Sequence, residues 1–254
     1  MKKKIGFIGF GTIGSFVYNK LKAEGDVELA FAFASKPVAD PEVARVFTNS
    51  KEEVIERCAQ GVDLVVECAT SAVVKELGLE VLKYTNLLLF SITAFADQAF
   101  SDAAHEVCEQ YKQTCFIPHG AILGLDGIFD GRSILESVTI TTTKKPANLG
   151  LTNTERQVMY EGPTRGACEL FPRNVNVHAA VALAGLGFDK TKSMIVSDPD
   201  VKGNTHRIEI IANGCQFAID VLSTPVSGVT GAYTPVSAYA SVKRALWHEG
   251  IVIA

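Results

Sequence analysis

The sequence has no surplus of positive charge, no paired cysteines and no long apolar run. Its 24 basic residues are outnumbered by 28 acidic ones, giving a formal net charge of −4. That balance argues against a nucleic-acid partner. No apolar stretch approaches the roughly 18 residues of a membrane helix, so we expect no membrane contact. The apolar run after the basic start is too short and glycine-rich for a signal peptide, which predicts a cytoplasmic protein.

The six cysteines are scattered without a C-x-x-C pair, which indicates neither a disulfide framework nor a zinc site. Three histidines, His119, His178 and His206, are too widely spaced to favour a metal site, and we expect none. With 47% hydrophobic and 20% charged residues over 254 positions, the chain can bury a substantial core. Its length fits one large domain or two modest ones.

The first part of the chain alternates short apolar runs with amphipathic stretches. This alternation is typical of βαβ units and a parallel sheet, so we predict a Rossmann domain over residues 1–120. The expected strands cover 5–8, 27–33, 63–68, 87–90 and 115–117, and the expected helices cover 12–23, 52–58, 72–83 and 99–111.

After Pro118 the pattern changes. Strands are expected at 137–143, 206–211 and 215–222, and the last two flank Asn213-Gly214, a strong hairpin turn. Helical patterns lie at 166–170 and 177–186. These elements predict a second, α+β domain with a mixed sheet over 121–225. Residues 226–254, with a helical pattern at 237–248, are expected to return to the first domain, so the fold class is α/β.

The segment Gly9-Phe10-Gly11-Thr12-Ile13-Gly14 has the pattern G-x-G-x-x-G between a predicted strand and a predicted helix. In this context Gly9 permits a tight turn, Gly11 lets a pyrophosphate approach, and Gly14 lets the helix lie close to the strand. The helix start, with Thr12 and Ile13, favours the phosphate charge. The alternative is a glycine-rich turn without a ligand.

The end of the second predicted strand reads Ala34-Ser35-Lys36, where an acidic residue would bind the adenosine ribose of NAD. Ser35 and Lys36 could instead bind the 2′-phosphate of NADP. We therefore predict NAD or NADP as cofactor. The alternative for Lys36 is a solvated loop charge.

Several segments, in the same order and at compatible spacings, resemble the L-aspartate dehydrogenase family. They are Val65-Val66-Glu67-Cys68-Ala69, Thr93-Ala94-Phe95-Ala96-Asp97, Gly120-Ala121-Ile122-Leu123-Gly124-Leu125-Asp126, Phe171-Pro172-Arg173-Asn174-Val175-Asn176-Val177, Asp198-Pro199 and Asn204-Thr205-His206. The resemblance implies hydride transfer from the α-carbon of aspartate to a nicotinamide, through iminoaspartate to oxaloacetate and ammonia. The imine can also feed NAD biosynthesis. The resemblance further implies a homodimer.

By this resemblance His206 is the catalytic histidine, and Cys68, Ala69, Ala121 and Asn176 contact the cofactor. A histidine with a pKa near neutrality suits the proton transfer that adds water to an imine, and typically contributes about 10²–10⁴-fold. The alternative for an isolated histidine at a strand start is a structural role.

We assign the substrate to His119, Asn174, His178 and Asn204. Asn174 and Asn176 precede an apolar helical run, where one of them could cap the helix, which leaves the other for a carboxamide or carboxylate. Arg173 could pair with a carboxylate or lie on the surface.

The chain departs from the family pattern in three places. His119 stands where the family usually has a small residue, and His178 stands where it has alanine. The family's Asn-Pro-Lys-Thr-Ser segment reads Thr-Pro-Val-Ser-Ala at 234–238. These changes leave open an imine or carbonyl reductase acting on another small acid. A non-catalytic NAD(P)-binding sensor is the hypothesis from another class, because fold does not imply function.

Overall fold

The computed structural model describes residues 2–227 and 230–247. The chain forms two compact units. One consists of Met1–Pro118 with the C-terminal segment from Pro235, and the other of His119–Thr234. None of the described helices is long and apolar enough to cross a membrane.

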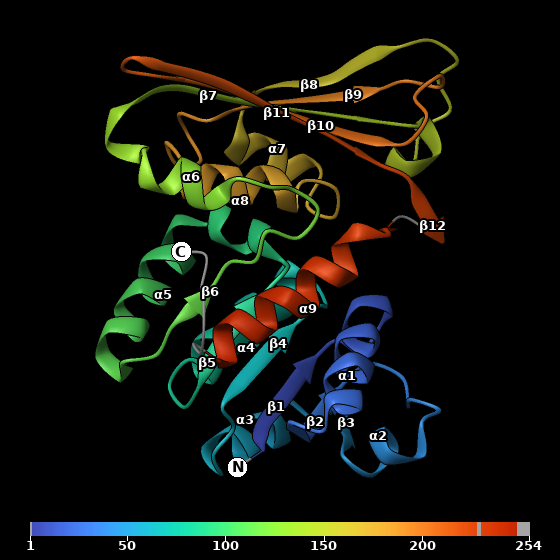
Figure 1. Cartoon of the computed structure of the whole chain (residues 1–254), viewed down its shortest axis with the longest axis vertical. Helices are drawn as coiled ribbons and strands as arrows, with labels where there is room; N and C mark the ends of the chain where they lie inside the picture. Colours follow the sequence, from blue (N-terminus) through green and yellow to red (C-terminus); the bar gives the residue numbers. More distant parts are fainter. Residues whose placement is uncertain (1, 228–229, 248–254) are drawn as a thin grey trace. The chain divides into compact units, whose positions relative to one another are not determined.

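The first unit contains a parallel sheet of six strands in the order β3-β2-β1-β4-β5-β6 (Figure 1). The strands are β1 (Lys3–Ile8), β2 (Val27–Phe33), β3 (Phe47–Thr48), β4 (Leu64–Glu67), β5 (Asn86–Leu89) and β6 (Cys115–Phe116). The helices are α1 (Thr12–Glu24), α2 (Pro41–Arg45), α3 (Lys51–Ala59), α4 (Ser71–Val81), the 3-10 helix η1 (Ile92–Ala96) and α5 (Gln98–Tyr111). The predicted Rossmann sheet is confirmed, whereas α2, β3 and η1 were not predicted. The strand order reverses between β1 and β4, where open α/β sheets bind ligands.

The C-terminal helix α9 (Tyr233–Leu246) packs on this first unit. Ala238 and Val242 are buried in the same apolar cluster as Phe7 and Leu64 of the central strands. At the surface, the Lys243 ammonium donates to a carboxylate oxygen of α1 at 2.8 Å. The helix thus supplies part of the hydrophobic core of the Rossmann unit, although more than 100 residues of the chain separate it from β6.

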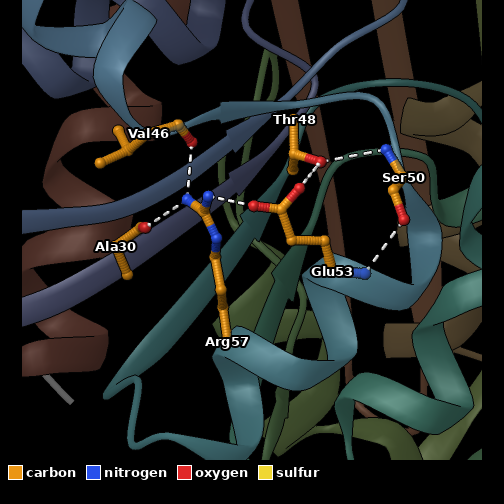
Figure 2. Close-up of polar contacts among 6 residues, drawn as sticks. All are labelled: Ala30, Val46, Thr48, Ser50, Glu53 and Arg57. Atoms are coloured by element: carbon orange, nitrogen blue, oxygen red, sulfur yellow. Dashed lines mark hydrogen bonds and ion pairs between the residues drawn. The ribbon is translucent and has the colours of Figure 1, made fainter.

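A hydrogen-bond network around Arg57 joins α3 to β2 and β3 (Figure 2). The Arg57 guanidinium donates to the carbonyls of Ala30 (3.0 Å) and Val46 (2.9 Å), and it pairs with the carboxylate of Glu53. The same carboxylate accepts from the hydroxyl of Thr48. The network holds the β2 strand in place, and the end of that strand carries the predicted ribose-binding residues.

The second unit contains a mixed sheet of five strands in the order β11-β10-β7-β9-β8. The strands are β7 (Leu135–Lys144), β8 (Gln157–Pro163), β9 (Lys192–Ser197), β10 (Asn204–Ala212) and β11 (Cys215–Ser223). The helices are α6 (Leu125–Asp130), α7 (Thr164–Leu170) and α8 (Asn176–Ala184), with 3-10 turns η2 (Arg132–Ile134) and η3 (Pro146–Leu149). The short strands β12 (Pro225–Ser227) and β13 (Thr230–Gly231) pair with each other. Figure 1 shows α6, α7 and α8 on one face of the five-stranded sheet.

The mixed sheet and the hairpin at Asn213-Gly214 are confirmed. Strands β10 and β11 pair antiparallel up to Ala212 and Cys215, and Gly214 has the positive φ of 76° that such a turn requires. Among the described strands of this five-stranded sheet, only β7 and β9 are parallel to each other, and the other pairs are antiparallel. Strands β8 and β9 and helix α6 were not predicted. Strand β8 is an edge strand of the sheet, and its glycine and proline weaken the alternating pattern that would predict a strand.

Strands β7 and β10 bury alternate side chains against the helices. On β7 the buried positions include Ile140, Thr142 and Lys144, and on β10 they include His206 and Ile208. The register pairs Thr142 directly with His206. Side chains of opposed residues lie close together in an antiparallel pair, so the sheet itself brings a hydroxyl to the histidine.

Candidate active site

The glycine turn between β1 and α1 has the geometry of a dinucleotide-binding loop. Gly9 has a φ of 90°, and a β-carbon on it would lie 2.7 Å from the carbonyl carbon of Cys68. A β-carbon on Gly14 would lie 2.6 Å from the Gly9 carbonyl oxygen. Both positions therefore require glycine, one for the turn and one for the approach of helix to strand.

Gly11 differs from the other two glycines, because a β-carbon there would meet no atom within 4 Å. Gly11 is also the residue before α1, and no side chain caps this helix. The first-turn N–H groups at Thr12, Ile13 and Gly14 are therefore left to an external acceptor. Open space beside uncapped N–H groups fits the pyrophosphate of a dinucleotide.

The loop after β4 places Cys68 and Ala69 against this turn, as the contact with Gly9 shows. The buried carboxylate of Glu67 holds the loop: it accepts from the Ala69 N–H at 2.6 Å and from the Ser91 N–H at 3.0 Å. The Ser91 hydroxyl donates to it at 2.8 Å. Burial raises the pKa of Glu67, while these hydrogen bonds act in the opposite direction. Glu67 thus links the ends of β4 and β5 beside the cofactor turn.

Ser35 and Lys36 follow β2 and are both exposed. They lie after the carboxyl end of the strand next to β1, on the side of the sheet where the Gly9 turn leaves β1. The position is compatible with the adenosine ribose of a dinucleotide.

In the second unit His206 is 5% exposed and is held by one ring nitrogen. Its Nδ1 lies 2.8 Å from the hydroxyl of Thr142. Its Nε2 has no hydrogen-bond partner within residues 2–227 and 230–247. Burial, and secondarily the positive charge of Lys144, lower the pKa of His206 to about 4. The imidazole is therefore neutral at pH 7, the form that can accept a proton.

His178, predicted to contact the substrate, is instead fully buried. Its Nε2 lies 2.6 Å from the Thr142 hydroxyl and its Nδ1 lies 2.8 Å from the Ser193 hydroxyl. Both ring nitrogens of His178 are thus used within the protein, and neither is left to bind a substrate. Thr142 links this ring to His206. Burial, followed by the charges of His206 and Lys144, lowers the pKa of His178 well below its usual range.

Lys144 was not predicted as a site residue, yet it is only 6% exposed and lies close enough to His206 to influence its pKa. Its ammonium donates to the side-chain oxygen of Asn174 at 3.0 Å and to the carbonyl of the same residue at 3.3 Å. Burial lowers the pKa of Lys144 to about 8. The ammonium form therefore still predominates at pH 7, and it provides a buried positive charge near His206.

The alternative in which Asn174 or Asn176 is the N-cap residue of α8 does not hold. Val175 occupies the N-cap position and no side chain caps the helix. Asn174 turns to Lys144 instead, and Asn176 is the first residue of the helix itself. Arg173 is exposed.

The other predicted site residues of the second unit are Asn204, His119 and Ala121. Asn204 is buried, and its side-chain oxygen accepts from Asn148 at 3.3 Å. His119 is half-buried and lies 3.4 Å from Asp126. Ala121 is half-buried in the turn that precedes α6. Within the described part of the chain, no cluster of histidine, cysteine and acidic side chains could hold a metal ion.

The depressed pKa of His206 predicts a loss of stability in acid. The folded-state value of about 4 lies below the ordinary 6.5, so the unfolded chain binds the extra proton between these pH values. Stability should therefore fall as the pH drops from 6.5 towards 4. We expect His206→Gln to remove about 2 kcal/mol of the difference in unfolding free energy between pH 7 and pH 4.5. Urea denaturation at both pH values, followed by circular dichroism, measures it. An unchanged difference would mean that His206 titrates normally.

Both units are similar to known protein families. Residues 129–245 match the C-terminal domain family of aspartate dehydrogenase, and residues 9–118 match the NAD-binding domain family of homoserine dehydrogenase. The L-aspartate dehydrogenase of Nitrosopumilus maritimus is 33% identical over 225 residues, which is 82% of each chain. That of Thermotoga sp. strain RQ2 is 34% identical over 233 residues, covering 91% of this chain and 92% of the relative.

A solved structure agrees with these matches. The crystal structure of aspartate dehydrogenase from Thermotoga maritima superposes with a TM-score of 0.81 at 28% identity and covers the whole of both chains. The glycine turn and the buried His206 fit these similarities, and the similarities show that the chain belongs to the L-aspartate dehydrogenase family.

Proposed function

We propose that this protein oxidises L-aspartate to iminoaspartate with NAD or NADP, and that water converts the imine to oxaloacetate and ammonia. The observation that carries the proposal is His206: a neutral imidazole held at Nδ1 by Thr142, with Nε2 left for a reacting molecule. The family membership supports the choice of aspartate.

The bound nicotinamide supplies the acceptor for the hydride of the substrate α-carbon. The turn from Gly9 to Gly14 would hold the pyrophosphate through the first-turn N–H groups of α1. The second unit supplies the group that moves protons. His206 Nε2 accepts a proton from water as the oxygen of that water adds to the imine carbon. The protonated imidazole then returns the proton to the nitrogen that leaves as ammonia.

Lys144 supplies a positive charge for this substrate, and Asn174 holds its ammonium in place. A buried ammonium in place before binding favours a carboxylate of aspartate. The arriving negative charge would also raise the pKa of His206 from about 4 towards neutrality. A base whose pKa lies nearer the working pH transfers protons more efficiently. Substrate binding would thus tune the base that acts on it.

Absorbance of the reduced nicotinamide tests the activity directly. We expect turnover with L-aspartate and NAD or NADP, and the reverse reaction with oxaloacetate plus ammonia. A panel of other small amino and oxo acids tests the imine or carbonyl reductase alternative. Turnover of another acid, with none of aspartate under either cofactor, would overturn the assignment.

Lys36→Glu tests the choice between the two cofactors. Because a carboxylate repels a 2′-phosphate, we expect this variant to weaken NADP binding at least tenfold, about 1.4 kcal/mol, and NAD binding much less. Fluorescence titration with both reduced cofactors measures the two affinities. Lys20→Glu, a charge reversal at an exposed position of α1, is the matched control. Equal losses for both cofactors would show that Lys36 does not meet the phosphate.

We also infer a homodimer formed through the uncovered face of the five-stranded sheet. The helices α6, α7 and α8 lie on the other face. Among the described residues, the face without these helices presents Ile211, which is 43% exposed and is opposed by Ser137 of β7 and Gln216 of β11. Sedimentation velocity should give a dimer for the native chain and a monomer for Ile211→Arg. A monomeric native chain would contradict this assembly.

A cytoplasmic location completes the proposal. All six cysteines are free, as expected where thiols are kept reduced, and nicotinamide cofactors serve as soluble substrates there. Detection of the protein in the soluble fraction of its source cells tests it.

A further inference from the structure

Behind His206 the second unit contains one continuous chain of buried hydrogen bonds. His206 Nδ1 meets the Thr142 hydroxyl at 2.8 Å, and the same hydroxyl meets His178 Nε2 at 2.6 Å. From His178 Nδ1 the chain continues to Ser193 (2.8 Å). It then passes from the Ser193 hydroxyl to the Thr164 hydroxyl at 2.8 Å and ends at the backbone carbonyl of Thr191 at 3.0 Å.

The last member of the chain sets its direction. A carbonyl oxygen can only accept, so the Thr164 hydroxyl must give its single hydrogen to Thr191. The Thr164 oxygen is then the acceptor for Ser193, whose own hydrogen is used in that bond. Ser193 can therefore only accept from His178, which must carry its hydrogen on Nδ1.

The same reasoning continues to His206. A neutral imidazole carries one N–H, so His178 with hydrogen on Nδ1 presents a lone pair at Nε2. Thr142 must donate its single hydrogen to that lone pair. The Thr142 oxygen then accepts, and the partner that donates to it is His206 Nδ1. The lone pair of His206 consequently lies on Nε2.

The opposite tautomer of His206 breaks this chain. With hydrogen on Nε2, the Nδ1 of His206 and the Nε2 of His178 would both need the single hydrogen of Thr142. One buried nitrogen would then lack a donor, which proteins rarely tolerate. Two positively charged rings are disfavoured as well, because burial lowers the pKa of both histidines.

We propose that His178, Ser193 and Thr164 are positioning residues that fix His206 in the Nδ1–H tautomer and so make its Nε2 the proton acceptor. The catalytic part of this inference rests on the proposed function. The tautomer itself does not, because it follows from the hydrogen bonds alone. A tautomer that is fixed in advance is available in every catalytic cycle. We therefore expect the network to affect the rate of proton transfer and not the affinity for substrate.

The test uses the full-length chain labelled with ¹⁵N in its histidines. Two-bond ¹H–¹⁵N spectra at pH 7 should show His206 with a protonated Nδ1 and an unprotonated Nε2, assigned with His206→Gln. In Ser193→Ala the His178 ring loses its fixed acceptor, so we expect a mixture of His206 tautomers. With aspartate, kcat should fall about tenfold while KM and cofactor affinity stay unchanged. Ser193→Thr, which keeps the hydroxyl, should restore both the spectrum and kcat.

Ser197→Ala is the matched control, because Ser197 is a buried serine of the same strand whose hydroxyl donates to Asn153 at 2.7 Å, outside the chain of hydrogen bonds. It should leave the spectrum of His206 unchanged. Thr164→Val serves as a second variant if Ser193→Ala does not fold. An Nε2–H tautomer in the native protein, or an unchanged spectrum in the folded variant, would overturn the proposal. An Nδ1–H tautomer in a protein that does not oxidise aspartate would overturn the proposed function and leave the tautomer assignment in place.

Discussion

Replacing His206 with alanine should lower kcat for aspartate oxidation by about 10²–10⁴-fold, the usual contribution of a positioned acid–base group. The cause is the loss of Nε2, the ring nitrogen that the described residues leave without a partner. Cofactor affinity should not change, because the glycine turn belongs to the other unit. Steady-state absorbance at saturating aspartate measures kcat, and fluorescence titration measures the affinity for NADH.

The control for this variant is His105→Ala, which removes an exposed histidine of α5 and should leave kcat unchanged. Ammonia release by the His206→Ala variant, measured separately from reduction of the cofactor, shows whether hydride transfer or hydrolysis of the imine has become the slow step. Full activity in this variant would exclude His206 as the proton acceptor. A native chain that binds NADH but turns over no amino or oxo acid would instead favour the sensor hypothesis.

The sequence pattern was sufficient for five strands of the parallel sheet and for the β10–β11 hairpin, whereas β3, β8 and β9 were not predicted. Alternation along 206–211 places His206, Ile208 and Ile210 on one face, as the structure shows. The same alternation on β7 puts Thr142 and Lys144 on the buried face with Val138 and Ile140. Polar side chains at buried positions of a strand indicate a hydrogen-bond network or a functional site, and Thr142 and Lys144 carry that signal on β7.

The rest of the hydrogen-bond chain could not be inferred from local patterns. His178, Ser193 and Thr164 come from α8, β9 and the start of α7, and only the packed fold brings these elements together. His178 looked like a pocket residue because it lies next to a recognisable motif, but neighbours in sequence on a helix face different directions. Ser193 also lay outside the predicted strands, since β9 was missed altogether. Thr164 lies just before the predicted helix at 166–170.

The three glycines of the cofactor turn make distinct demands, and this gives the second large prediction. A methyl group on Gly11 would meet no protein atom within 4 Å, and its φ of −84° suits any residue. Gly11→Ala should therefore fold as the native chain does. The added methyl group would occupy the space of the pyrophosphate, so we expect the Kd for NADH to rise at least tenfold, about 1.4 kcal/mol.

Gly14→Ala should behave differently, because its methyl group would lie 2.6 Å from the Gly9 carbonyl oxygen. The turn must move to relieve that contact, and both Tm and NADH affinity should decrease. Gly127→Ala in α6, where a methyl group also meets nothing within 4 Å, controls for the loss of a glycine and should leave NADH affinity unchanged.

Calorimetry and NADH titration of the three variants separate folding from binding. If Gly11→Ala bound NADH like the native chain, the pyrophosphate would not lie against that residue. The interpretation of the turn as a cofactor site would then be wrong, even though its backbone has the expected shape. If Gly11→Ala lost affinity for NADH and kept its Tm, glycine at this position would be required for binding the cofactor and not for folding.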